Sequence, residues 1–157
     1  MTISVVGAHW IDGEWIPSAG AAKFDAVSPV DGAVIGGVPE GGRAAAEAAI
    51  AAARRAFFQS QWAHSPRLRA DVLQAQAAAV EARSDDLSRL LSIETGKLIG
   101  VARMEIAAAA SELRYYAGLA RAIGGRMLEI EPGVYSHLVR EPAGVAAIIT
   151  PWNAPAI

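Results

Sequence analysis

Short runs of alternating apolar and polar residues, separated by turn residues, occupy the first forty positions of the chain. Asp12-Gly13 separates two Trp-Ile pairs at 10–11 and 15–16, and this dipeptide favours a tight hairpin turn because glycine tolerates a positive φ. A second pair of runs covers 24–27 and 33–38, on either side of the turn sequence Pro29-Val30-Asp31-Gly32. The pattern therefore predicts two β-hairpins.

Between residue 43 and about residue 124 the apolar residues recur at helical spacing, which predicts four helices over about 44–58, 66–83, 84–93 and 98–123. Ser65-Pro66 supplies an N-cap and a first-turn proline for the second helix, and Ser84-Asp85-Asp86 is predicted to cap the third. Gly124-Gly125 ends the fourth. Its apolar stripe consists of two series with a seven-residue repeat: Ile99, Ile106, Leu113 and Ala120, and Ala102, Ala109, Tyr116 and Ile123. This stripe faces either its own domain or a coiled-coil partner.

Three strand-like runs follow the fourth helix. The first two, 126–130 and 134–140, flank the turn Glu131-Pro132-Gly133 and predict a third hairpin. The third, 145–150, is apolar on both faces, which is typical of a strand in a parallel sheet covered by helices. Parallel neighbours need long crossover connections. We therefore expect an incomplete α/β fold, the opening part of a larger protein.

Alanine dominates the composition, with 35 of 157 residues, and it favours helices while burying little area. The 14 basic and 16 acidic residues give a net charge of −2, so the sequence offers no basic surface for nucleic acid or for an anionic membrane. No apolar run is long enough to cross a bilayer. Cysteine is absent, which fits a cytoplasmic location and excludes a thiolate nucleophile in this chain. We expect neither a nucleic-acid nor a membrane partner.

The sequence lacks the patterns of the common metal, phosphate-binding and serine-nucleophile sites. His9, His64 and His137 are isolated, so no metal ligand is predicted. Neither a glycine-rich phosphate loop nor a serine nucleophile elbow is present. Glu94-Thr95-Gly96-Lys97 is either a functional loop or a helix C-cap with its glycine in the left-handed region, and the spacing favours the cap.

The tetrapeptide Thr150-Pro151-Trp152-Asn153 is the remaining candidate site. Ligands in open α/β sheets bind beyond the carboxyl ends of strands, where this segment would lie. The Asn153 amide is a neutral donor that could point at a developing negative charge. Local chemistry alone leaves an ordinary turn as the alternative.

Six short motifs follow one another along the chain: Ile11-Asp12-Gly13-Glu14-Trp15, Ser28-Pro29-Val30-Asp31-Gly32, Glu94-Thr95-Gly96-Lys97, Leu113-Arg114-Tyr115-Tyr116-Ala117-Gly118, Arg140-Glu141-Pro142-Ala143-Gly144-Val145 and Thr150-Pro151-Trp152-Asn153-Ala154-Pro155. In this order they resemble the amino-terminal part of the NAD(P)-dependent aldehyde dehydrogenase superfamily. The resemblance implies that 1–123 belongs to the cofactor-binding domain, that 124–144 contains an oligomerisation hairpin at 124–142, and that 145–157 begins the Rossmann-like core and the active-site motif. It also implies a homo-oligomer.

The same resemblance implies a reaction and its residues. Members of the superfamily oxidise a small-molecule aldehyde with NAD or NADP, through a cysteine thiolate that adds to the carbonyl and leaves a thioester after hydride transfer. The position matching Asn153 donates its amide to the oxyanion. The positions matching Ile149, Thr150, Pro151 and Trp152 line the cofactor cleft. Ala154 departs from the family, whose usual residue there is aromatic.

The cysteine and the glutamate base lie downstream in the superfamily, so we expect this chain to be inactive alone. Two other interpretations stay open. The chain could be a non-catalytic remnant that binds full-length subunits, or part of a semialdehyde dehydrogenase that transfers the acyl group to coenzyme A. The sequence leaves the aldehyde and the choice between NAD and NADP undecided.

Overall fold

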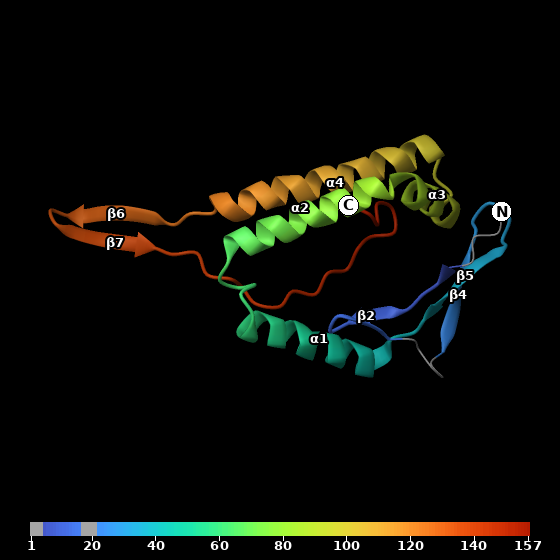
Figure 1. The fold of residues 1–157 in the computed structure, drawn as a ribbon, viewed down its shortest axis with the longest axis horizontal. Coiled ribbons are helices and arrows are strands. Elements are labelled where there is room, and N and C mark those ends of the chain that lie inside the picture. The colour runs from blue at the N-terminus through green and yellow to red at the C-terminus, as the bar shows by residue number, and fades with distance from the viewer. Residues whose placement is uncertain (1–4, 17–21) are drawn as a thin grey trace.

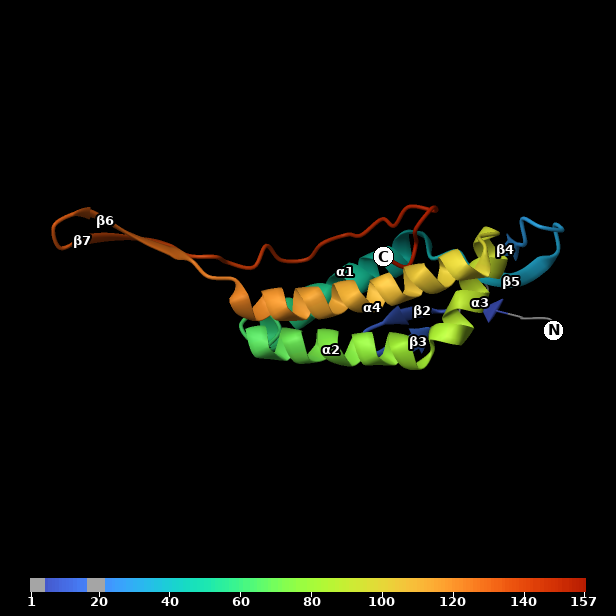
Figure 2. The same ribbon diagram turned by 90° about the horizontal axis from the view of Figure 1, so that it is seen from above.

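The structure is a computed structural model that describes residues 5–16 and 22–157. Helices α2 and α4 lie side by side in opposite directions, α3 lies at one end of the pair, and α1 forms a separate layer (Figures 1 and 2). The bounds of the helices are α1 Gly42–Gln59, α2 Pro66–Ala82, α3 Ser84–Thr95 and α4 Ile99–Ala122. The sequence therefore predicts all four helices, with ends that differ by at most a few residues.

All three predicted hairpins are present. Strands β2 (His9–Ile11) and β3 (Glu14–Ile16) are antiparallel, with Trp10 opposite Trp15. Asp12 and Gly13 both have positive φ, 57° and 83°, as a two-residue hairpin turn of this type requires. Strand β4 (Lys23–Val27) is antiparallel to β5 (Val34–Pro39), and β1 (Val5–Val6) joins β5 in parallel to complete a three-stranded sheet.

The third hairpin projects away from the helices. Strand β6 (Arg126–Glu131) pairs with β7 (Val134–Leu138), and every residue of both strands is exposed. Figure 2 shows the hairpin extending beyond the end of α4, out of contact with the helical layers. An isolated two-stranded hairpin is at best marginally stable in water. The described part of the chain offers this hairpin no supporting surface.

Helix α2 begins where the sequence predicts. The Ser65 hydroxyl accepts a hydrogen bond of 3.2 Å from the Leu68 N–H, and Pro66 occupies the first turn. Helix α3 differs in detail, because Arg83 occupies its N-cap position and the structure gives that side chain no capping bond among the described residues. Ser84 does not act as the cap, while Asp85 and Asp86 lie in the first turn as predicted.

Replacing Ser65 with alanine is expected to destabilise the chain by about 1 kcal/mol, because the Leu68 N–H loses its acceptor. The urea midpoint, followed by far-UV circular dichroism, measures this change. Ser111→Ala, at an exposed position within α4, should leave the midpoint nearly unchanged. Equal midpoints for the two variants would show that the cap contributes nothing.

The buried core is small and rich in alanine. Leu91, Ala102 and Ile106 form its centre between α3 and α4, with Val80, Leu87 and Ala156 packed against them. The predicted stripe of α4 is buried only in its middle part, since Ile99, Tyr116 and Ile123 remain exposed. The stripe thus faces its own domain through the centre of the helix, and its two ends are left without cover.

The strand predicted at 145–150 is not formed among the residues that the structure describes. These residues belong to the described part of the chain and are extended, but they pair with no other strand there. A strand needs a neighbour for its backbone N–H and C=O groups, and the described segments bring none beside it. Residues 145–150 instead run lengthwise from the hairpin toward α3 (Figure 1). The Rossmann-like sheet is therefore not formed here.

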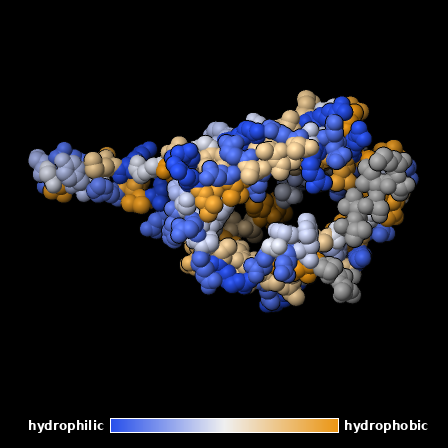
Figure 3. Space-filling view, viewed as in Figure 1, coloured by the Kyte–Doolittle hydropathy of each residue, from blue (hydrophilic) through white to orange (hydrophobic). Residues whose placement is uncertain are grey.

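The surface also carries uncovered apolar area. Figure 3 shows a hollow between the layer of α2 and α4 and the layer of α1, with apolar side chains exposed inside it. Ile148, Ile149 and Trp152 are among the large apolar residues left exposed. Within the described ranges, no helix is long and apolar enough to span a bilayer.

Candidate functional site

Lys97 leaves the end of α3 in a fixed direction. Gly96 ends the helix in the left-handed conformation, with a φ of 73°. The Thr95 hydroxyl donates to the Leu91 carbonyl at 2.6 Å, and the Ser92 hydroxyl donates to the Lys97 carbonyl at 2.7 Å. The Glu94-Thr95-Gly96-Lys97 segment is thus the helix C-cap that its sequence favours, and it also directs a lysine side chain.

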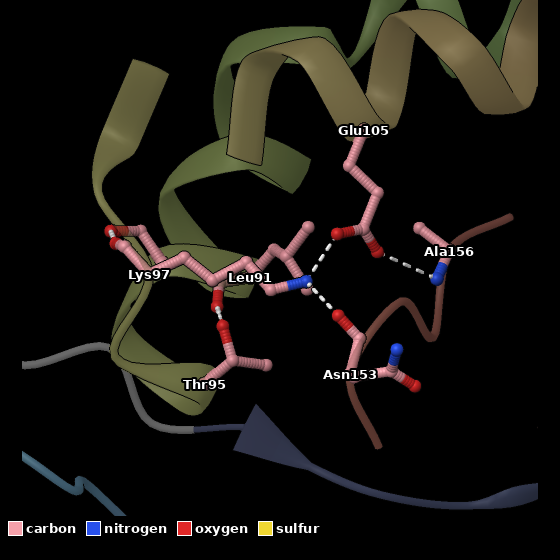
Figure 4. Close-up of polar contacts among 7 residues, drawn as sticks. Leu91, Thr95, Lys97, Glu105, Asn153 and Ala156 are labelled. Carbon is pink, nitrogen blue, oxygen red and sulfur yellow. Dashed lines mark hydrogen bonds and ion pairs between the residues drawn. The ribbon is translucent and has the colours of Figure 1, made fainter. Parts of the chain in front are cut away.

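The Lys97 ammonium contacts two groups from distant parts of the chain. It forms an ion pair with Glu105, which lies on α4, and it donates a hydrogen bond of 2.8 Å to the backbone carbonyl of Asn153 (Figure 4). The other carboxylate oxygen of Glu105 accepts a hydrogen bond of 3.0 Å from the Ala156 N–H. The two side chains together hold both ends of the segment 153–156.

The ion pair is largely withdrawn from water, with side-chain exposures of 14% for Lys97 and 6% for Glu105. Burial raises the pKa of the Glu105 carboxyl, but the hydrogen bonds from Lys97 and Ala156, together with the Lys97 charge, outweigh burial and hold the pKa below its ordinary 4.5. Glu105 is therefore ionised at neutral pH, so the pair is a charged clamp.

This pKa shift predicts the pH dependence of stability. Because the pKa is lower in the folded chain, the stabilisation from Glu105 is complete above its unfolded pKa of 4.5 and is lost as the pH falls through the folded pKa. Glu105→Gln should therefore weaken the acid-induced loss of stability below that pH. Urea midpoints measured from about pH 7 to about pH 3 test this expectation. Glu112→Gln, at an exposed position of the same helix, should retain the wild-type profile.

The Asn153 side chain is exposed, and its amide points away from the Lys97 ammonium (Figure 4). The residues before it are exposed as well, with Ile149 94% and Trp152 87% accessible, and Thr150 and Pro151 also on the surface. The structure thus brings the Asn153 backbone to Lys97 and Glu105. It leaves the five predicted site side chains facing outward.

Sequence patterns do not single out Glu105, and they indicate Lys97 only within the Glu94-Thr95-Gly96-Lys97 segment, as part of a functional loop or a helix C-cap. A signal for Glu105 was available, because it is an acidic residue beside Ala102, Ile106 and Ala109 on the buried face of α4. A lone carboxylate on an apolar face needs a partner, and Lys97 is one of only two lysines in the chain.

A further hollow lies away from these residues. A cavity of about 790 Å³ is found at the opposite end of the α2–α4 pair, lined by residues that include Trp62, His64, Arg69 and Arg140. It contains none of the predicted site residues. Across the described residues, no three His, Cys, Asp or Glu side chains come together as a metal site.

Comparison with known proteins identifies the fold. A sequence model described as the aldehyde dehydrogenase family matches residues 15–157. Betaine aldehyde dehydrogenase from Bacillus subtilis (strain 168) is 37% identical over 148 residues, which cover 93% of this chain and 30% of that protein. Hydroxyisobutyraldehyde dehydrogenase from Mycolicibacterium austroafricanum is 33% identical, with 93% and 29% covered.

Solved structures that resemble this chain are also aldehyde dehydrogenases. An NAD-dependent aldehyde dehydrogenase from Sinorhizobium meliloti matches with a TM-score of 0.92 and 36% identity, covering 99% of this chain and 32% of that one. A Staphylococcus aureus betaine aldehyde dehydrogenase variant in complex with NAD+ matches with a TM-score of 0.86 and 37% identity, covering 93% and 30%. The chain spans about 30% of the length of these relatives. It belongs to the aldehyde dehydrogenase family.

Proposed function

We propose that the whole protein oxidises an aldehyde to a carboxylic acid with NAD or NADP, and that this chain supplies the oxyanion donor while the thiolate comes from elsewhere. One observation carries the proposal. Asn153, the only asparagine in the chain, presents its side chain outward from a turn whose backbone is held by the buried Lys97–Glu105 pair. A preorganised donor of this kind stabilises charge that develops during a reaction.

The chemistry places one demand on Asn153. Addition of a thiolate to the aldehyde carbonyl turns the carbonyl oxygen into an anion, and the Asn153 amide N–H donates to that oxygen. Collapse of the anion would pass the C–H hydrogen as hydride to NAD or NADP and would leave a thioester for water to cleave. Asn153 brings no proton that could quench the anion, because an amide is a neutral donor. Aspartate could not serve, since its carboxylate only accepts.

The residues before Asn153 fit a cofactor. Ile149 and Trp152 expose apolar surface next to the donor, and Thr150 and Pro151 connect them. Large aromatic and aliphatic surface beside a few polar groups is typical of small-molecule sites. NAD or NADP supplies the hydride acceptor when bound. The S. aureus relative, whose structure contains NAD+, supports this assignment.

We assign the segments accordingly: residues 1–123 to the cofactor-binding domain, 124–144 to an assembly hairpin, and 145–157 to the first strand of the core and the start of the active site. The exposed β6–β7 hairpin supports the second assignment, because its unpaired strand edges can accept a strand from another copy of the chain. The hollow between the layers supports the third, because it leaves apolar surface for the core to cover.

The absence of cysteine favours a second candidate. A chain without a thiol cannot form the covalent intermediate, so it could instead act by binding complete subunits. Transfer of the acyl group to coenzyme A is a variant of the enzymatic candidate. The enzymatic candidate and the binding candidate give different results in one experiment.

The experiment joins residues 1–157 to the part of B. subtilis betaine aldehyde dehydrogenase that lies beyond the matched segment. We expect this chimera to reduce NAD+ in the presence of betaine aldehyde and the unjoined chain to show no turnover. A folded chimera that forms no NADH, together with binding of the unjoined chain to intact relatives, would favour the binding protein.

A further inference from the structure

We propose that Lys97 and Glu105 are positioning residues that set the direction of the Asn153 amide. The proposal rests on the function proposed above and adds two residues to it. Neither side chain contacts the Asn153 amide. Both act on the backbone, Lys97 at the carbonyl of residue 153 and Glu105 at the N–H of residue 156.

The two hydrogen bonds, at residues 153 and 156, restrict the backbone of the turn more than either would alone. The hydrogen bond from Lys97 fixes the peptide plane that leaves the Cα of Asn153, and the side chain starts from that same Cα. The hydrogen bond to Glu105 fixes the other end of the turn, where Ala156 also packs against the core of Leu91, Ala102 and Ile106. The Asn153 side chain therefore starts from a backbone that is held on its C-terminal side, and it turns about its own side-chain bonds.

The clamp is itself rigid. Lys97 begins at a helix end that the Ser92 hydroxyl and the left-handed Gly96 hold in place. Glu105 lies on the buried face of α4. A lysine side chain has many rotamers in solution, but here its ammonium is held between a carboxylate and a carbonyl. Such a buried and paired cation has little room to move.

The charges explain why the two residues act as a unit. Without Lys97, the Glu105 carboxylate is left buried with the Ala156 N–H as its one remaining partner in the described structure. A buried charge without its counter-ion is strongly unfavourable, so the carboxylate must move toward water or take up a proton. Either change loosens the turn. Loss of Lys97 therefore removes both anchors of Asn153.

A double-mutant cycle in the chimera tests the proposal. Misplacement of a reacting group by about 1 Å can cost about 10²-fold in rate, and we expect Lys97→Met to lower kcat by about 10-fold to 10²-fold with a smaller change in KM. Lys97→Arg keeps a cationic donor and should recover most of kcat. Lys23→Met, at the only other lysine and on the exposed strand β4, should leave kcat unchanged.

Dependence on Asn153 separates positioning from a general structural role. If Lys97 acts through Asn153, Lys97→Met costs nothing further in an Asn153→Ala background. Losses that multiply would overturn the proposal, as would an unchanged kcat in Lys97→Met. A normal kcat for Asn153→Ala would instead overturn the proposed role of Asn153 in the reaction.

Hydrogen exchange gives a readout that does not depend on activity. We expect amides of 153–157 to exchange faster in Lys97→Met than in Lys23→Met, while amides of the hairpin 126–138 stay unchanged. Equal exchange at 153–157 would overturn the clamp. If the Lys97→Met chimera does not fold, Glu105→Gln takes its place, because it removes the charge and keeps an oxygen for the Ala156 N–H. Unfolding of both variants would assign the pair to folding and overturn positioning.

Discussion

Replacing Asn153 with alanine in the chimera is expected to lower kcat by about 10²–10³-fold, as the loss of one oxyanion donor commonly does. The amide contributes most when the carbonyl oxygen becomes an anion, and less when the neutral aldehyde binds. The loss should therefore fall on kcat more than on KM. Steady-state rates of NADH formation with saturating NAD+ measure both parameters.

Two controls sharpen this expectation. Asn153→Asp keeps the shape but removes the donor and adds a negative charge, so its kcat should be at least as low as that of the alanine variant. Gln74→Ala removes the same chemical group from an exposed position on α2 and should leave kcat unchanged. An Asn153→Ala enzyme with wild-type kcat would show that another group stabilises the anion.

Residues adjacent in the sequence determine one hairpin turn and one helix start. The turn at Asp12-Gly13 follows from two positive φ values that few residue pairs adopt, and the start of α2 follows from Ser65 and Pro66. The strand predicted at 145–150 depends instead on other strands beside it. Its apolar sequence indicates burial on both faces, but these residues are exposed in the described structure.

The candidate site also combines a residue that the sequence indicates with contacts that only the structure shows. Asn153 stands out in the sequence because a proline and a tryptophan precede it in a recognisable motif. The contacts of Lys97 and Glu105 with the turn become visible only in three dimensions, because these hydrogen bonds join residues 56 and 51 positions apart. Helical spacing alone places Glu105 on the apolar face of α4. It does not indicate that the chain returns to cover that face with the residues around Asn153.

Ile106 and Ile99 distinguish what the helical repeat predicts from what packing decides. They lie seven residues apart on one stripe of α4, so the repeat treats them as equivalent. In the structure Ile106 is 5% exposed and packs with Leu91 and Ala102, whereas Ile99 is 41% exposed. Ile106→Ala should therefore destabilise the chain by about 2–5 kcal/mol, since it removes buried methylene groups and leaves a cavity.

Ile99→Ala is the matched control, with the same atoms removed from the same helix, and its effect should stay below about 1 kcal/mol because the side chain is already partly in water. Urea midpoints followed by far-UV circular dichroism compare the two variants. Since Ala156 packs on the same core, Ile106→Ala should also speed amide exchange at 153–157, which Ile99→Ala should not. Equal destabilisation by both variants would mean that the whole stripe is covered in solution. The most direct explanation would then be a second copy of the chain packed against α4.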